Sequence, residues 1–238
     1  MPNWVANDVV VRGTEEQMLN LFNDALANSG EEKKDNVQDA FDTLVSKAKH
    51  KESKRDGIAD FEVKVREVEL VKGFTLRTIL PIPDTFLMYD TTNHPEKFPE
   101  VAAEQQAKYG AMGWYLYNVK TLGTKWDAEI ETSRLTEKDG IYSWGFLCDS
   151  AWSPITRFLE CLIDTYGVRA FNYATDEGYN FVFYEEVNGD EKDFTGQFIE
   201  LFEMYNEETE EDSENYYDAV DKLESNVRDE YDDFILNA

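Results

Sequence analysis

Carboxylates are the chemistry-bearing side chains that this sequence concentrates in one region. Residues 185–233 contain 20 Asp and Glu against three Lys and Arg, a balance of −17 in a chain of net charge −27. Apolar residues recur at helical spacing through 194–205 and 216–234, which predicts two amphipathic helices. Carboxylates spread along helices can imitate the regularly spaced charges of a phosphate backbone. The region is therefore predicted to bind a basic protein of the kind that binds nucleic acid.

The predicted partner-binding surface is the acidic side of these two helices. Its residues are Glu203, Glu207, Glu208, Glu210, Glu211, Asp212, Asp218, Asp221, Asp229, Asp232 and Asp233. The same charge argues against direct nucleic-acid binding, because phosphate contacts require Lys and Arg. The apolar stripes need a surface to cover, which is either the main sheet or a second copy of the chain. A homodimer is one possible arrangement, since the last stripe is heptad-like but short.

Other reactive groups form no catalytic or metal-binding pattern. The two histidines, His50 and His94, have no ligand cluster near them in sequence, and Ser153 before a proline is interpreted as a helix N-cap. Cys148 and Cys161 lie in apolar stretches and are interpreted as buried thiols. No cofactor is predicted and the protein is predicted not to be an enzyme; carboxylates acting with a divalent metal are the remaining catalytic alternative. No apolar run approaches the roughly 20 residues that cross a bilayer, so no membrane partner is expected.

The elements that would carry this acidic surface alternate between strands and helices. Strands are predicted over residues 4–11, 61–66, 74–80, 141–148, 168–173 and 179–184. Helices are predicted after a capping box at Thr14 and Gln17, and then over residues 37–48, 99–109 and 154–166. No glycine fingerprint of a dinucleotide-binding fold accompanies them. The pattern indicates an α+β sandwich with helices on one face of an antiparallel sheet.

Three ordered motifs resemble a known family. They are residues 1–7 (MPNWVAN), residues 114–118 (WYLYN) with 123–128 (GTKWDA), and residues 150–154 (SAWSP). Together they are similar to phage and plasmid proteins of the YubB-like or Api-like kind, and they bracket residues 1–184. Leu122 and Ile155 depart from the family pattern, where Trp and a second Pro are expected. The acidic region after residue 186 is not part of the resemblance.

The resemblance implies a fold and an origin more than an activity. It implies a ferredoxin-like domain over residues 1–186 with inserted helices, to which residues 187–238 add an acidic helical extension. A phage-type protein acts in the host cytoplasm, so the basic partner is expected to be a host protein, such as a defence factor, that this protein inhibits. The alternative function is a nucleic-acid or small-ligand module whose sheet is autoinhibited by the acidic C-terminal region.

The aromatic residues of the motifs have two interpretations. Trp4, Trp114, Trp126 and Trp152 are expected to be core and loop-anchoring residues rather than ligand stackers. The loop 123–125 could hold an anion or could be only a tight turn into the next strand. The position of these residues in the fold decides between the two interpretations.

Overall fold

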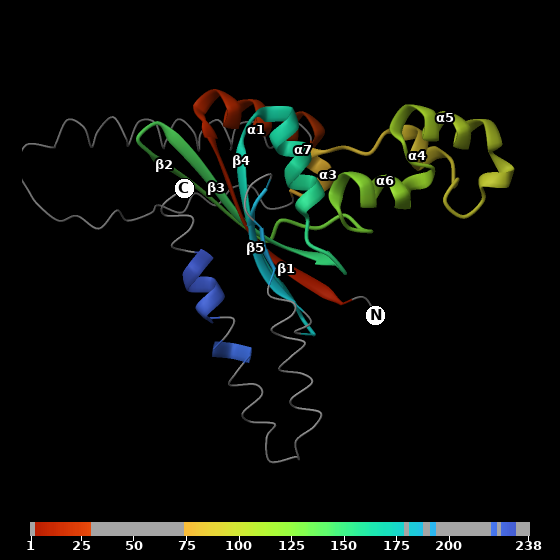
Figure 1. The fold of residues 1–238 in the computed structure, drawn as a ribbon. Helices are drawn as coiled ribbons and strands as arrows, with labels where there is room; N and C mark the ends of the chain where they lie inside the picture. Colours follow the sequence, from red (N-terminus) through yellow and green to blue (C-terminus); the bar gives the residue numbers. More distant parts are fainter. Residues whose placement is uncertain are drawn as a thin grey trace, which may run out of the picture.

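The chain builds one antiparallel sheet with helices packed on it (Figure 1). The computed structural model describes residues 3–29, 74–178, 181–187, 191–193, 220–222 and 225–231. The strand order is β2-β3-β1-β4-β5-β6. The strands are β1 Trp4–Thr14, β2 Thr132–Lys138, β3 Ile141–Ala151, β4 Arg169–Asp176, β5 Val182–Glu186 and β6 Glu191–Asp193.

The first four strands have ferredoxin-like connectivity. Helix α1 (Glu15–Ser29) follows β1, and helix α7 (Thr156–Tyr166) connects β3 to β4. The βαββαβ order places β1 between β3 and β4, with antiparallel pairing on both sides. The predicted ferredoxin-like α+β fold is confirmed, and β5 and β6 extend the sheet beyond β4.

The main core lies between the sheet and helices α1 and α7. Alternate residues of β1 face it, so Val5, Val9 and Val11 are fully buried while Trp4 and Ala6 on the other face are exposed. Trp144 of β3 and Phe22 of α1 pack ring against ring, with centroids 5.1 Å apart. Trp144 pairs with Val11 of β1, and the same antiparallel register brings the start of β1 beside the end of β3, where Trp4 pairs with Ala151.

Between α1 and β2, the described residues 74–131 form four helices and a short 3-10 turn. They are α3 Leu76–Ile79, α4 Asp84–Met88, η2 Pro95–Lys97, α5 Pro99–Tyr109 and α6 Gly113–Leu122. In Figure 1, α4, α5 and α6 form a lobe beside the sheet. Phe86 holds this lobe together because its ring contacts both Tyr109 and Tyr117. Helix α6 ends at Gly123, whose φ of 80° is the left-handed conformation that favours glycine.

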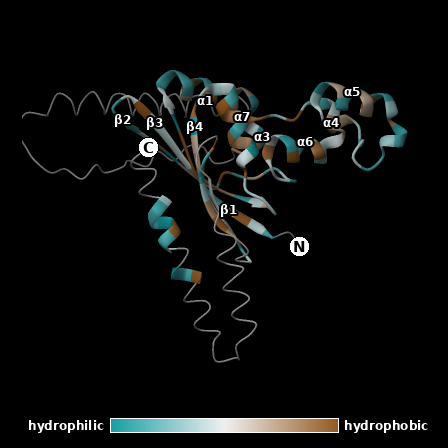
Figure 2. Ribbon diagram, in the orientation of Figure 1, coloured by the Kyte–Doolittle hydropathy of each residue, from teal (hydrophilic) through white to brown (hydrophobic). Residues whose placement is uncertain are grey.

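The acidic C-terminal region contributes two short helical segments, residues 220–222 and 225–231, here called the C-terminal segments. They lie on the sheet face opposite α1 and α7 (Figure 1), and hydrophilic colour predominates on them in Figure 2. Val220, Val227 and Tyr231 are nevertheless buried, and they pack against the β4 and β5 residues Phe171, Tyr173, Val182 and Tyr184. The last apolar stripe was expected to pack either on the main sheet or on a second copy of the chain. The described residues of that stripe pack on the chain's own sheet.

Most of the predicted elements that the structure describes are present, with one wrong assignment. Residues 74–80 were predicted as a strand, but they contain helix α3. Thr75 caps this helix through a reciprocal capping box with Thr78, which overrides the alternation of apolar residues. Strand β2 and helix α6 were not predicted. The predicted helix at 37–48, strand at 61–66 and apolar stripe at 194–205 lie outside the described residues.

The two cysteines are free thiols in different environments. Cys148 is buried in β3 and burial raises its pKa, while Cys161 on α7 is half-buried and burial also raises its pKa. Because only the thiolate reacts, we expect Cys148 to resist a thiol reagent at about pH 8 until the protein unfolds. Labelling a Cys161→Ser variant with and without denaturant measures this directly. Native labelling of Cys148 at the rate of a free thiol would contradict it.

Candidate functional site

Two of the predicted partner-binding carboxylates lie in the described residues. Asp221 and Asp229 are both exposed on the C-terminal segments. The other nine lie outside the described residues: Glu203, Glu207, Glu208, Glu210, Glu211, Asp212, Asp218, Asp232 and Asp233. The part of the acidic surface that the structure places is therefore solvent-facing, above a buried apolar stripe.

The carboxylate-bearing segment 225–231 has a specific seat on the sheet. Arg228 Nη1 lies 2.7 Å from Asp8 Oδ2 of β1, and the Tyr231 hydroxyl donates to the Asp8 carbonyl at 3.2 Å. The Arg228 guanidinium also lies 5.0 Å from the centroid of the Tyr173 ring. A second hydroxyl, that of Tyr184, donates to Glu230 Oε2 at 3.2 Å. These contacts fix where Asp229 projects, because they hold residues on both sides of it.

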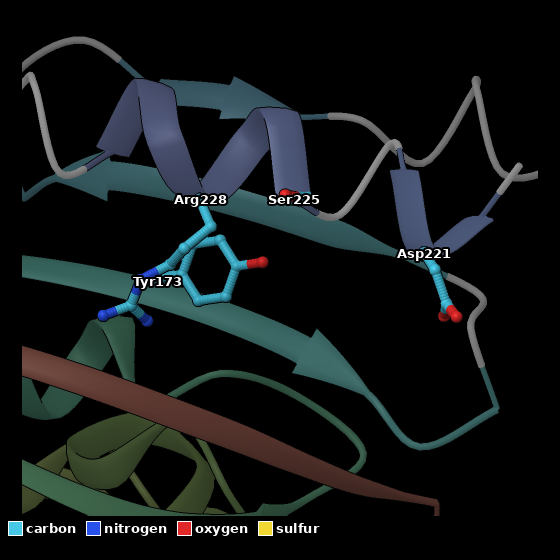
Figure 3. A pocket seen from close by; sticks show the side chains of 4 residues that line it. All are labelled: Tyr173, Asp221, Ser225 and Arg228. Atoms are coloured by element: carbon cyan, nitrogen blue, oxygen red, sulfur yellow. The ribbon is translucent and has the colours of Figure 1, made fainter. Parts of the chain in front are cut away.

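A pocket of about 400 Å³ opens between the C-terminal segments and β4. Tyr173, Asp221, Ser225 and Arg228 line it, and Figure 3 shows the Arg228 side chain reaching from its helix toward the Tyr173 ring. Of its polar lining residues, Arg228 holds the helix to the sheet, since its guanidinium pairs with Asp8. The pocket marks the seam between the C-terminal segments and the sheet.

A second exposed surface contains three indole rings that come from distant parts of the chain. Trp4 begins β1, Trp126 follows α6 and Trp152 follows β3; we call these three residues the tryptophan cluster. The ring centroids of Trp4 and Trp126 are 6.1 Å apart, and those of Trp126 and Trp152 are 5.3 Å apart. The three side chains remain 40%, 37% and 48% exposed, respectively. These three residues were expected to be core and loop-anchoring residues, and the core part of that expectation is wrong for them; the fourth residue, Trp114, is half-buried.

Lys125 lies over the cluster. Its Nζ is 4.8 Å from the ring centroid of Trp126, 5.4 Å from that of Trp152 and 5.7 Å from that of Tyr115. Aromatic faces attract cations in this range. Within the loop 123–125, Gly123 caps α6 and Lys125 faces rings, so the geometry favours a turn over an anion-binding loop.

A buried polar residue joins the strands beneath the cluster. The Asn7 side-chain amide donates to Ser150 Oγ at 2.9 Å and to the Cys148 carbonyl at 3.2 Å. Its oxygen accepts from the Ile155 N–H at 3.2 Å and from the Asn172 amide at 3.3 Å. Asn7 therefore connects β1 to β3, to β4 and to the start of α7.

Side chains from the second and third motifs lock the two loops together. Thr124 Oγ1 accepts from the Ala151 N–H at 2.9 Å, and Ser153 Oγ donates to the Gly123 carbonyl at 2.6 Å. The interpretation of Ser153 as a helix N-cap is wrong, since Ile155 occupies that position and makes no side-chain cap. The sequence analysis therefore did not assign the structural roles of Asn7, Thr124 and Ser153, although all three lie within the quoted motifs.

Trp152 itself has a backbone conformation that bulky residues rarely adopt. Its φ is 66°, in the left-handed region, and its N–H donates to the Asn3 carbonyl at 2.9 Å. Such conformations cost of order 1–3 kcal/mol and persist where the surrounding structure enforces them. The loop thus holds the Trp152 ring at the surface against a local preference.

Three residues next to members of the tryptophan cluster, in sequence or in the sheet, carry exposed carboxylates. Asp149 lies opposite Ala6 in the β1–β3 register, and the Glu177 N–H donates to the Trp4 carbonyl at 2.9 Å. Asp127 follows Trp126 in sequence, and its Oδ1 accepts from the Arg77 N–H at 3.0 Å. The cluster is therefore an exposed aromatic surface with a lysine over two of its rings and with acidic residues nearby.

The class of this protein follows from its fold alone, because comparisons with known proteins add nothing to it. No protein-family model, curated protein or solved structure matches the chain. In the ranges that the structure describes, no group of three or more His, Cys, Asp and Glu is placed to hold a metal ion. Among those same residues, no helix has the length and apolarity to cross a bilayer. The chain is an α+β protein with a ferredoxin-like sheet whose second face is partly covered by its own C-terminal segments.

Proposed function

We propose that this is a non-enzymatic interaction protein that binds and inhibits a basic, nucleic-acid-binding partner through its acidic C-terminal surface. The observation that carries the proposal is the specific seat of the segment 225–231, which Arg228 and Tyr231 attach to Asp8. A net charge of −27 steers cationic partners toward the molecule. Charges held in place lose less freedom on binding than charges on a mobile chain, so they bind more tightly.

The resemblance of the three motifs to phage and plasmid YubB-like proteins suggests where such a partner would be found. A phage-type inhibitor would act in the host cytoplasm, on a host protein such as a nuclease or another defence factor. Carboxylates along the C-terminal helices would take the place of nucleic-acid phosphates in its basic groove. The proposed activity is thus occlusion of that groove and not chemistry on a substrate.

Neutralising the acidic face should weaken inhibition much more than removing the same charge elsewhere. In the test variant, Asn replaces Asp218, Asp221, Asp229, Asp232 and Asp233. In the matched control, Gln or Asn replaces the exposed residues Glu96, Glu100, Glu104, Asp139 and Asp164. We expect the test variant to lose about tenfold or more in affinity, since each exposed pair contributes some tenths of a kcal/mol, and the control to lose less than about threefold.

The assay is competition with DNA for a defined partner. Immobilised wild-type protein captures a basic protein from host lysate at low salt, and the purified partner is then bound to a labelled DNA duplex. The wild-type chain should displace the duplex, less effectively as the salt concentration rises. Equal displacement by the test variant and wild type would overturn the proposal.

One observation favours the alternative, an autoinhibited module. The face that the C-terminal segments cover carries Phe171, Tyr173 and Tyr184, and exposed aromatic residues on a sheet can stack nucleobases. In this second candidate function, displacement of the segments would expose a base-stacking surface. Unseating the segments distinguishes the two functions, as described in the Discussion.

A further inference from the structure

The acidic surface explains attraction but not how a partner would be held. Exposed charges mainly raise association rates, whereas a few aromatic or arginine anchors supply most of the affinity of an interface. The tryptophan cluster is an exposed group of such aromatic residues, and the function proposed above gives it no role. The following inference rests on that proposed function, because it assigns the cluster to the same basic partner.

The cluster and the C-terminal segments lie within reach of one partner. Trp4, Ala6 and Asp8 share one face of β1, and Asp8 is the residue that Arg228 binds. Asp8 lies four residues further along the strand than Trp4, a span of about 13 Å. Ala6 between them is exposed. A standard interface covers about 800 Å² on each partner, so it could extend over both surfaces.

The chemistry around the cluster suits a cation. Lys125 shows that two of its rings accept one, since its ammonium lies 4.8 Å from the ring centroid of Trp126 and 5.4 Å from that of Trp152. The exposed Asp149, opposite Ala6 in the register of β1 and β3, and the exposed Glu177, whose N–H donates to the Trp4 carbonyl, add negative charge near the cluster. A guanidinium fits better than an ammonium here, because it is planar, stacks on indole faces and can pair with a carboxylate at its edge.

We propose that the tryptophan cluster docks an arginine side chain of the basic partner. The guanidinium stacks on an indole face and takes over the position that Lys125 holds in the free protein. The surface is already formed before binding, because Asn7, Thr124 and Ser153 fix its loops and Trp152 is held in a left-handed conformation. Such preorganisation reduces the entropy lost when the partner binds.

The test compares two polycations of equal charge on the full chain. A nona-arginine and a nona-lysine peptide are titrated against wild type and variants, with tryptophan fluorescence and calorimetry as readouts. Wild type should prefer the arginine peptide by about fivefold. Trp126→Ala should abolish most of this preference. Trp4→Ala should reduce it. Because Trp4 is the exposed first residue of β1, this variant tests the proposal even if Trp126→Ala folds poorly.

Lys125→Met distinguishes an arginine-docking site from an anion-binding site, because the substitution should strengthen ligand binding at the first and weaken it at the second. Removing the competing ammonium should strengthen binding of the arginine peptide. The gain in affinity should be about threefold larger than the gain caused by Lys138→Met. Lys138 is a matched control, since it is an exposed lysine in the β2–β3 hairpin at the far end of β1 from Trp4. If Lys125→Met instead abolishes binding to a single-stranded oligonucleotide and leaves the peptides unaffected, the cluster is a nucleic-acid site and the proposal is overturned.

Failure of this inference is separable from failure of the proposed function. One outcome rejects only the acidic-face assignment: the Trp variants lose the arginine preference, but the five-site acidic variant inhibits the basic partner as well as wild type does. Unchanged arginine preference in both Trp variants, with weakened binding in the five-site variant, rejects only the docking of arginine on the cluster.

Discussion

Replacing Tyr231 by Ala should release the C-terminal segments from the sheet. The ring is buried and packs on Tyr173 and Tyr184, with centroids 5.4 and 5.8 Å away, and its hydroxyl donates to the Asp8 carbonyl. Truncating a buried aromatic residue costs about 3–5 kcal/mol. A short terminal segment opens with less free energy than the whole domain, so this loss should unseat it. Hydrogen exchange and limited proteolysis of residues 220–231 measure the release.

Tyr231→Phe is the control, because it keeps the ring and removes only one hydrogen bond. It should cost about 1 kcal/mol and leave the segments protected. Equal protease sensitivity of wild type and Tyr231→Ala would show that Tyr231 is not what holds the segments.

The same variant separates the two candidate functions. If fixed carboxylates bind the basic partner, Tyr231→Ala should lose inhibition along with the ordered seat of Asp229. If the segments autoinhibit a base-stacking sheet, the variant should gain affinity for single-stranded RNA or DNA, since Phe171, Tyr173 and Tyr184 become exposed. The two outcomes differ in sign, so one nucleic-acid titration beside one inhibition assay decides between them.

Asn7→Ala should cause a large loss of stability from a single polar substitution. It leaves the Ile155 N–H and the Asn172 amide without the oxygen that accepts from them, in a position that is 1% exposed. Each buried donor that loses its acceptor costs about 1–3 kcal/mol, so about 3–5 kcal/mol is expected. Chemical denaturation followed by tryptophan fluorescence measures this free energy and reports on the cluster above Asn7.

Ser150→Ala is the matched substitution in the same network. It removes one hydroxyl that accepts from Asn7 and donates to the Ser153 carbonyl, and should cost about 1–2 kcal/mol. If Asn7→Ala were no more destabilising than Ser150→Ala, Asn7 would not be the residue that joins β1, β3, β4 and α7.

Local sequence signals predicted the elements whose ends are set by neighbouring residues. Helix α1 begins at the reciprocal pair Thr14 and Gln17, which the structure contains as two hydrogen bonds of 2.8 and 3.3 Å. Helix α5 begins and ends at the predicted residues, with Pro99 in its first turn and a left-handed Gly110 after its last residue. Helix α7 was likewise predicted from a clear apolar stripe.

The wrong and missed elements have physical explanations. Phe74, Leu76 and Leu80 fit both a strand and a short helix, and the capping hydrogen bonds of Thr75 decide for the helix. Strand β2 was missed because Leu135 is the single buried apolar residue within it that the structure describes, so it lacks the alternation of a half-buried strand. β2 is a strand because it forms a hairpin with β3, in which Lys138 pairs with Ile141, and not because of its own composition.

The concentration of carboxylates after residue 184 is visible in the sequence, whereas the tryptophan cluster could not be predicted from it. The carboxylates of 185–233 are close together in sequence, so composition alone reveals them. Trp4, Trp126 and Trp152 meet because β1 pairs with β3 and because Ser153 holds Gly123. Long-range pairing of this kind leaves no periodic signal, and the three motifs were visible only as separate segments.

The central position of β1 has a consequence for how the chain reaches its native state. β1 is synthesised before both of its neighbours in the sheet, β3 and β4, which begin only at residues 141 and 169. An apolar strand containing Val9, Val10 and Val11 must therefore wait without its sheet partners while more than half of the chain is added. Folds dominated by such distant pairings form slowly and expose strand edges to aggregation. Rapid capture of β1 by α1, which packs directly on it, would shorten the interval in which this strand can associate with another chain.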